Sequence, residues 1–158
     1  MRRALFVHFS TAAIAVLLLI CCCLFSGLKT GEMIALDALS HLDAPYVLGA
    51  AGPSKFDCSG LLVHCFRRQG LPLSHSAEII GTDDHYRLLM KPSQLVVGDI
   101  VCFDTVSDRD PSDHVGVWLG ANRFVHASSG GKKVMISELD GYYLERFTGA
   151  RRYFFPYF

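Results

Sequence analysis

The sequence lacks an excess of charge of either sign. Its 158 residues hold 15 Lys and Arg against 15 Asp and Glu. The basic residues are scattered, and the pair Lys132-Lys133 is too short to form a basic tract, so we interpret it as a solvated turn. A protein that binds nucleic acid through its phosphates needs a concentrated basic surface. The composition therefore predicts no nucleic-acid partner.

The sequence also lacks the cysteine pairs of a metal site. Three of the six cysteines lie in an N-terminal apolar run, and Cys58, Cys65 and Cys102 follow later, with no CxxC spacing. Three cysteines cannot all pair, and Cys58 and Cys65 would be about 10 Å apart along a helix, too far for a disulfide. We predict that Cys65 and Cys102 are small buried apolar residues.

A single long apolar run is present, from Ala12 to Leu28, after Arg2 and Arg3. A basic start followed by an apolar core is typical of a secretory signal or a signal anchor. We therefore predict that residues 1–28 are a signal peptide or an N-terminal membrane anchor, with the following domain exported. The run is long enough to span a bilayer. No clear cleavage or lipoprotein site follows it, which leaves both forms open.

The rest of the chain shows helical patterns first and strand patterns later, with no internal repeat. Helices are predicted over Glu32–Leu42, Asp57–Gln69 and near Ser76–Gly81, and strands over Ile100–Phe103, His114–Leu119, Arg123–Ala127, Val134–Ser137 and Arg151–Phe155. Pro45–Phe56 and Asp104–Asp113 are predicted to be loops. This order favours an α+β domain with N-terminal helices packed on an antiparallel sheet.

Cys58 stands in the first turn of a predicted helix, between Asp57 and the pair Ser59-Gly60. The free N–H groups and the positive dipole end of a helix stabilise a thiolate, and the same groups can stabilise an oxyanion. Gly60 keeps side-chain bulk away from that approach. Taken alone, this position is more often structural, because a nucleophilic cysteine also needs a base and an orienting partner.

Two histidines offer that base and partner, because His114 opens one predicted strand and His126 lies on the next. A three-residue loop at 120–122 would pair Leu119 with Arg123 and place both histidines on one face, about 7–8 Å apart at Cα as diagonal neighbours. A two- or four-residue loop would place them on opposite faces. A shared site therefore requires an odd-length loop or a bulge. Without it, each histidine is an ordinary strand residue.

Three motifs occur in a recognisable order. They are Phe56-Asp57-Cys58-Ser59-Gly60-Leu61, Leu95-x-x-Gly98-Asp99-x-Val101-x-Phe103 and His114-Val115-Gly116-x-x-Leu119-Gly120, extended by Arg123-Phe124-Val125-His126-Ala127. Together they closely resemble the NlpC family of papain-like cell-wall cysteine endopeptidases. The similarity runs from about Glu32 to Phe154, so residues 29–158 are expected to form one NlpC-type domain with its nucleophile at a helix N-terminus.

The resemblance implies a role for each matching residue. Cys58 is the expected nucleophile, His114 the general base that activates it, and His126 the residue that holds the His114 ring. Tyr46, Asp57 and Ser59 match positions that line the substrate cleft in this family. In members that cut dipeptide-bearing stems, the acidic residue before the nucleophile meets a free amine. From the residues alone, Asp57 is equally well a helix cap and Tyr46 a packing residue.

The implied activity is hydrolysis of peptide-stem or cross-link bonds of peptidoglycan, such as D-glutamyl–diaminopimelate. Thiol acyl transfer needs no cofactor and no metal. The partners expected are peptide stems, and the membrane if the N-terminal segment is retained. The chain is expected to act as a monomer in the periplasm or cell envelope, anchored in the inner membrane if the N-terminal segment is retained. An Ala at position 50 and a Leu at position 73 depart from the family pattern and leave substrate preference open.

Three alternatives remain. One is a related thiol amidase or acyltransferase, although the order of Cys58, His114 and His126 differs from permuted lipid acyltransferases, which place histidine first. Another is a catalytically dead module that binds peptidoglycan. The third is a zinc site formed by the same three side chains, since three ligands and a water can make a catalytic centre.

Overall fold

A computed structural model describes residues 16, 18, 19, 30–106 and 112–154. The predicted signal or anchor, residues 1–28, lies outside the described residues apart from Val16, Leu18 and Leu19. In the described ranges, no helix combines the length and the apolar character that crossing a membrane requires.

An antiparallel sheet forms the centre of the fold. Its strands are β1 (Arg87–Leu89), β2 (Ile100–Phe103), β3 (His114–Gly120), β4 (Arg123–Ser128), β5 (Lys133–Glu138) and β6 (Phe147–Arg152). They lie in the order β1-β6-β2-β3-β4-β5, and each neighbouring pair is antiparallel. The sheet is a meander from β2 to β5, and β6 returns to the free edge of β2.

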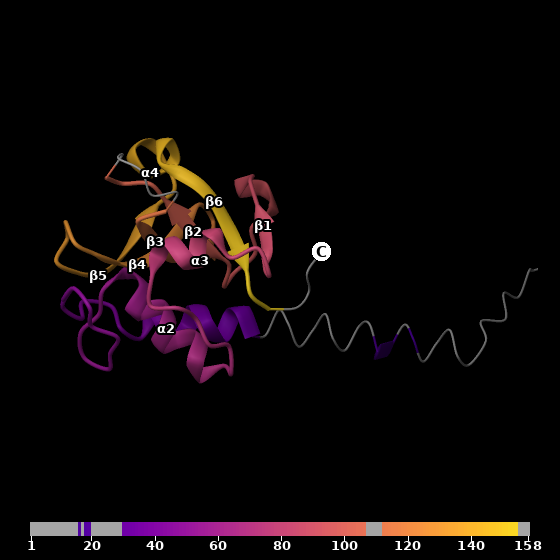
Figure 1. The fold of residues 1–158 in the computed structure, drawn as a ribbon, viewed down its shortest axis with the longest axis horizontal. Helices are drawn as coiled ribbons and strands as arrows, with labels where there is room; N and C mark the ends of the chain where they lie inside the picture. Colours follow the sequence, from indigo (N-terminus) through magenta and orange to yellow (C-terminus); the bar gives the residue numbers. More distant parts are fainter. Residues whose placement is uncertain (1–15, 17, 20–29, 107–111, 155–158) are drawn as a thin grey trace, which may run out of the picture.

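Helices cover both faces of this sheet. Residues 30–39 are helical, followed by α2 (Cys58–Arg68), α3 (Ala77–Thr82), the short 3₁₀ helix η1 (Pro92–Gln94) and α4 (Gly141–Glu145). Figure 1 shows α2 on one side of the sheet and α4 on the other. The predicted α+β class, with the first helices packed against an antiparallel sheet, is confirmed.

Alternation along the strands divides the core into two layers. Val115 and Val117 belong to the cluster on the α2 side, together with Leu61 and Phe66 of α2. Trp118 and other residues of the opposite parity belong to the second cluster, which packs under α4. Because a strand turns successive side chains to opposite faces, β3 buries residues in both layers. The position of α2 on the first layer brings its N-terminus to the start of β3.

The Gly98-Asp99 pair of the second motif turns the chain into the buried strand β2. Gly98 has a φ of +93°, and a Cβ there would overlap the backbone of Gly31. Asp99 is fully buried and pairs with Arg152 of β6, with 2.7 Å between Oδ1 and Nε. A buried carboxylate needs such a charged partner to offset its desolvation. This ion pair connects the turn before β2 to the last residue of β6.

The structure corrects some predicted boundaries. The last strand begins earlier, at Phe147, and ends at Arg152, whereas Tyr153 and Phe154 are buried outside any strand and Phe155 lies outside the described residues. The strand β1 and the helix α4 were not predicted. Both are short, and their pattern is too brief to separate from a loop, because packing on the sheet and not local propensity stabilises them.

Candidate active site

Cys58 is the first residue of α2, at a helix start whose neighbouring residues are buried. Asp57 is the N-cap, and its Oδ1 accepts the Gly60 amide at 2.7 Å. Gly60 cannot be larger, because a Cβ there would overlap the Ala50 carbonyl oxygen. The prediction that the helix includes Asp57 is therefore off by one residue. The expected placement of the thiol in the first turn is confirmed, and Cys58 is partly exposed.

A bulge sets the register of the β3–β4 hairpin. The turn contains two residues, Ala121 and Asn122, both with positive φ (48° and 60°), and it pairs Gly120 with Arg123. The register then shifts, which leaves Leu119 as the extra residue. The predicted three-residue loop is thus wrong, but the alternative that was named with it, a bulge, is present.

This bulge brings the two histidines of the hairpin together. Beyond it, Val117 pairs with Val125, which is the register that places His114 and His126 on one face. Nε2 of His114 lies 2.7 Å from Nδ1 of His126, within hydrogen-bonding distance. His126 is fully buried, and His114 is partly exposed. The pair therefore has one end enclosed by the protein and one end open.

The thiol lies beside the first residues of β3. Sγ of Cys58 is 4.0 Å from the carbonyl oxygen of Asp113, and the backbone amide of Val115 also acts on the sulfur as a hydrogen-bond donor. These two residues flank His114 in the sequence. Because Nε2 of His114 is engaged with His126, Nδ1 is the nitrogen left to reach toward the thiol. Helix start, strand start and histidine pair therefore meet at one place.

Burial keeps these groups neutral. It raises the pKa of the Cys58 thiol, and the Asp57 charge raises it further, although the amides of Ser59 and Val115 act in the opposite direction. Burial lowers the pKa of His114 to about 4 and, with the neighbouring His114, that of His126 to about 3. The expected stabilisation of a thiolate by the helix start is present but outweighed. At neutral pH the site holds a thiol and two uncharged imidazoles.

The carboxylate of Asp57, next to Cys58, accepts several hydrogen bonds. Besides capping α2, it accepts the Gly49 amide on Oδ2 at 2.6 Å and the Ser59 hydroxyl on Oδ1 at 3.3 Å. His75 Nε2 lies 2.9 Å from the same Oδ1. The capping role considered from the sequence is therefore confirmed. Because Asp57 and Ser59 are both 5% exposed, their predicted contact with substrate stays a prediction.

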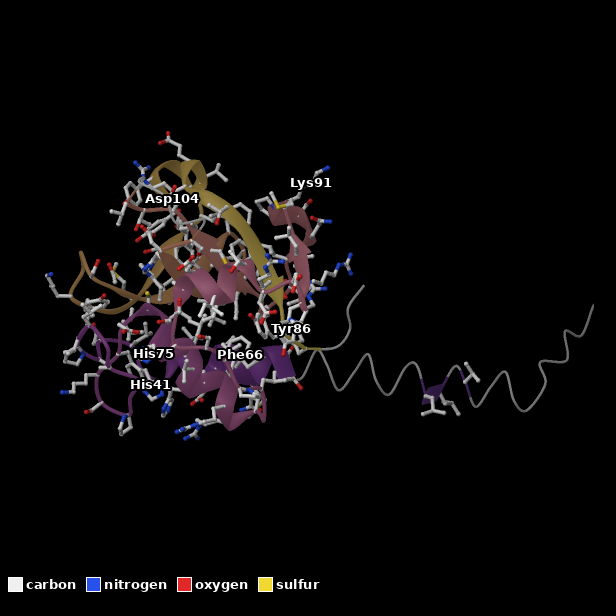
Figure 2. The ribbon with its side chains drawn as sticks, viewed as in Figure 1. His41, Phe66, His75, Tyr86, Lys91 and Asp104 are labelled. Atoms are coloured by element: carbon white, nitrogen blue, oxygen red, sulfur yellow. The ribbon has the colours of Figure 1, made fainter. Side chains whose placement is uncertain are left out.

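Tyr46 and His75 complete this side of the site. Tyr46 is half-buried, and its hydroxyl has a pKa raised by burial and by the nearby Cys58 and Asp57. His75, on the α2 side of the molecule in Figure 2, belongs to none of the motifs found in the sequence, yet it pairs with Asp57. No periodic signal links a loop histidine to a residue 18 positions earlier, so the pattern of the sequence could not find it.

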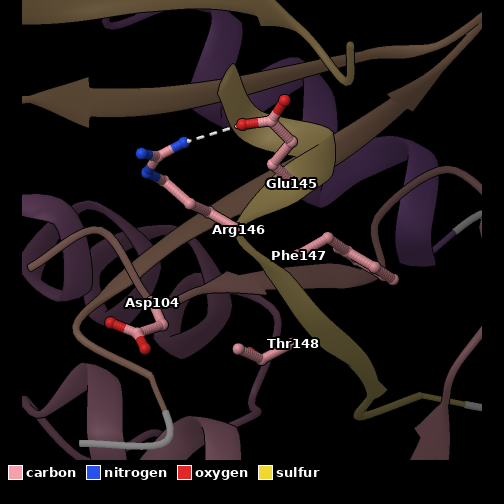
Figure 3. A pocket seen from close by; sticks show the side chains of 5 residues that line it. All are labelled: Asp104, Glu145, Arg146, Phe147 and Thr148. Carbon is pink, nitrogen blue, oxygen red and sulfur yellow. Dashed lines mark ion pairs between the residues drawn. The ribbon is translucent and has the colours of Figure 1, made fainter. Parts of the chain in front are cut away.

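A pocket of about 260 Å³ lies beside His114, which forms part of its lining. Apart from His114 its lining carries hydroxyl and backbone groups, contributed by Thr105, Ser128, Ser129, Gly130, Tyr142 and Tyr143. A second pocket, of about 320 Å³, lies around the start of β6 (Figure 3). It is lined by Asp104, Phe147, Thr148 and the Glu145–Arg146 ion pair. Only the first contains a residue of the predicted triad.

The described part of the chain holds one group of three side chains whose ligand atoms lie close enough to share a metal ion. It consists of Asp83, Asp84 and His85. Cys58 and the hairpin histidines are not in it, so their geometry does not favour the zinc alternative. An exposed acidic cluster of this kind does not by itself indicate a metal site.

The fold, together with the grouping of Cys58, His114 and His126, defines a papain-like α+β domain. Its thiol lies at a helix start, beside a histidine pair on the sheet. The chain belongs to the NlpC/P60 family, whose sequence model matches residues 43–152. The resemblance inferred from the three motifs is therefore confirmed. The match includes both sides of the site, from the loop before α2 to the end of β6.

Individual relatives agree with this assignment. The chain is 36% identical to gamma-DL-glutamyl hydrolase of Bacillus subtilis (74% of this chain, 28% of the relative) and 34% identical to the probable peptidoglycan endopeptidase LytE of the same organism (81% and 36%). The solved structure of NlpC2 from Trichomonas vaginalis superposes with a TM-score of 0.71 at 29% identity, over 79% of this chain and 46% of that one. The chain thus spans less than half the length of each.

Proposed function

We propose that this protein is an exported cysteine endopeptidase that hydrolyses peptide-stem or cross-link bonds of bacterial peptidoglycan through Cys58, His114 and His126. The observation that carries the proposal is the 2.7 Å contact between the two imidazoles at the strand start beside the thiol. Relatives named as a peptidoglycan endopeptidase and a gamma-DL-glutamyl hydrolase support the substrate class. D-Glutamyl–diaminopimelate is a bond of that class.

The proposed reaction begins with both groups neutral. Nδ1 of His114 takes the proton of the Cys58 thiol as the sulfur attacks the peptide carbonyl carbon, and the oxygen of that carbonyl becomes an oxyanion. Backbone N–H groups at the start of α2 are in place to stabilise it. The imidazolium of His114 then protonates the leaving amine, which departs as the C–N bond breaks. Water hydrolyses the remaining thioester with His114 again acting as base.

His126 has the orienting role in this proposal. By accepting the Nε2 proton of His114 on its own Nδ1, it keeps Nδ1 of His114 unprotonated and directed at the thiol. It also stabilises the imidazolium that forms during attack. The pocket beside His114, with its hydroxyl-rich lining, is the proposed location for the peptide on one side of the scissile bond.

The decisive experiment compares digests of purified peptidoglycan by mass spectrometry. The Cys58→Ala variant should release fragments at a rate at least about 10³-fold below the parent, because removing a nucleophile leaves only residual catalysis. Cys65→Ala, which removes the buried thiol of the same helix, should keep the parent's products. Equal digestion by the parent and Cys58→Ala would refute the proposal. Binding of both proteins with no cleavage would instead identify a wall-binding module.

The proposed location is the periplasm or cell envelope, with residues 1–28 directing export. Support comes from the sequence alone, from the basic start and the apolar run. Fractionation followed by intact-mass measurement tests it. A mass reduced by the N-terminal segment indicates a cleaved signal, a full-length membrane-bound form indicates an anchor, and a full-length cytoplasmic protein contradicts export.

A further inference from the structure

The hydrogen bonds of the histidine pair continue past His126. Its Nε2 lies 2.9 Å from the hydroxyl of Ser137, a residue of β5. Tyr143 of α4 covers the same place, with its ring centroid 5.4 Å from that of His126 and 6.5 Å from that of His114. The side chains of Ser137 and Ser128 act on the Tyr143 hydroxyl as hydrogen-bond donors. Two further side chains thus adjoin the pair.

We propose that Ser137 and Tyr143 are positioning residues that hold His126, and through it His114, in the protonation pattern that catalysis requires. This inference rests on the proposed role of Cys58, His114 and His126. In this inference α4, a helix of five residues that covers the outer face of the sheet, has the role of carrying Tyr143 to the histidine pair.

Proton counting provides the first argument. If Nδ1 of His126 accepts the Nε2 proton of His114, the single proton of the neutral His126 ring must be on its own Nε2. That N–H points into a fully buried site and needs an acceptor. Ser137 Oγ, at 2.9 Å, is that acceptor. Without it, the favoured tautomer of His126 would bury an unsatisfied donor, and the opposite tautomer would compete.

The second argument concerns Ser137 itself, whose hydroxyl hydrogen must also be used. It is donated to the Tyr143 hydroxyl, on which Ser128 also acts as a donor. Ser128 Oγ in turn accepts the Gly131 amide at 2.9 Å, which fixes this serine to the backbone. With its hydrogen directed at Tyr143, the Ser137 oxygen presents its lone pairs to the imidazole N–H of His126.

The ring of Tyr143 provides the third argument. It meets His126 nearly edge-on, at an interplanar angle of 80°, and also contacts Phe103 and Phe124 at 5.2 and 4.9 Å between centroids. These contacts occupy the outer face above the histidines. Water is thereby kept from offering His126 an alternative partner, which would weaken the preference for one tautomer.

Two variants test the proposal. Ser137→Ala removes the acceptor, and Tyr143→Phe removes the hydroxyl but keeps the ring. Ser137→Ala should lower kcat on peptidoglycan fragments about 10-fold with little change in KM, because Ser137 acts only through His126. Tyr143→Phe should lower kcat by a similar factor, and its KM does not bear on the test, because Tyr143 also lines the pocket proposed for the peptide. Ser137→Thr, which keeps a hydroxyl, should recover activity to within about 3-fold of the parent. Ser40→Ala and Tyr86→Phe, at positions outside the network, are matched controls.

A readout independent of activity separates this inference from the proposed function. Long-range ¹H–¹⁵N NMR of Cys58→Ala reports which ring nitrogen of His126 is protonated. We expect the proton on Nε2, and a mixture of tautomers once Ser137→Ala is added. An unchanged tautomer and unchanged kcat in Ser137→Ala, with Cys58→Ala inactive, would overturn the inference and leave the triad intact. An active Cys58→Ala would refute the triad instead.

Discussion

At the scale of single residues, the state of Cys58 is set by opposing influences. Burial and the charge of Asp57 raise the pKa of the thiol, and the amides at the helix start lower it. Because the raising influences win, the proposed mechanism couples deprotonation to attack on the substrate, with His114 as the acceptor. The same Asp57 that caps α2 therefore also disfavours the thiolate form of Cys58.

This balance predicts the behaviour of Asp57→Asn. The variant keeps an oxygen to cap α2 but loses the negative charge, so the pKa of Cys58 should fall and the thiol should react faster near neutral pH. The pH profile of alkylation by iodoacetamide, followed by mass spectrometry at Cys58, measures this. Asp84→Asn, at an exposed position, is the control. A midpoint that stays in place or rises in Asp57→Asn would contradict the electrostatic explanation.

Residue-level prediction from sequence succeeded where a residue and its reason are local. Asp57 as a cap and Cys65 as a buried residue follow from helix geometry, and the structure has both. Gly60 was expected to leave room for an oxyanion, and the structure shows that within the fold it leaves room for the Ala50 carbonyl oxygen. His75 stood out in no motif, because its partner Asp57 lies 18 positions earlier in the sequence. Ser137 was placed in a strand, but its hydrogen bond to His126 depends on the β4–β5 pairing.

At the scale of elements, the hairpin of β3 and β4 is the part on which the site depends. Its turn has two residues, which would put the histidines on opposite faces, and the extra residue at Leu119 restores their shared face. Gly116 of β3 packs closely against the residues of β4 that include His126. A Cβ there would stand 2.7 Å from the Phe124 ring, 2.9 Å from the Val125 carbonyl oxygen and 3.2 Å from the Cβ of His126.

Gly116→Ala should therefore damage the site more than the fold. The added methyl must displace Phe124 or His126, which we expect to cost about 1–3 kcal/mol of stability and to lower kcat by about 10-fold or more as the imidazole pair separates. Thermal unfolding and peptidoglycan digestion measure the two effects. Gly130→Ala, where the nearest atom would be 3.9 Å away, is the matched control for thermal unfolding only, because Gly130 lines the pocket proposed for the peptide. Parent-like kcat in Gly116→Ala would refute the proposed close fit.

The elements themselves were predictable in proportion to their length and periodicity. Helix α2 and the central strands β2 to β5 appear within one or two residues of the predicted ranges. The helix predicted over Glu32–Leu42 ends earlier, at residue 39. Strand β1, of three residues, and helix α4, of five, escaped prediction, because their few residues carry no distinguishable period and owe their form to the surface on which they pack.

At the scale of the whole molecule, the enclosed histidines couple folding to pH. Their pKa values are lowered to about 4 for His114 and about 3 for His126, against 6.5 for an unperturbed histidine. The unfolded chain therefore binds more protons than the folded chain between pH 6.5 and 4. The stability that this burial contributes is present above pH 6.5 and is lost as the pH falls through that window.

We accordingly expect the free energy of unfolding to fall from pH 7 to pH 4.5, with a slope approaching about 1.4 kcal/mol per pH unit for each buried histidine. Denaturant unfolding at a series of pH values measures it. His64 also has a lowered pKa and adds to the slope, so the comparison with His126→Asn isolates the site. That variant should show a shallower dependence. An equal slope in both proteins would show that the buried pair is not responsible.

The sequence by itself determined the class of the domain, the place of Cys58 at a helix start and the family, because these depend on local periodicity, capping and motif order. Only the tertiary structure decided how the histidines meet, what lies behind them and which charge state the site holds. A bulge, a remote hydroxyl and the burial of an imidazole arise from contacts between segments far apart in the chain. No local pattern encodes the distance between such segments.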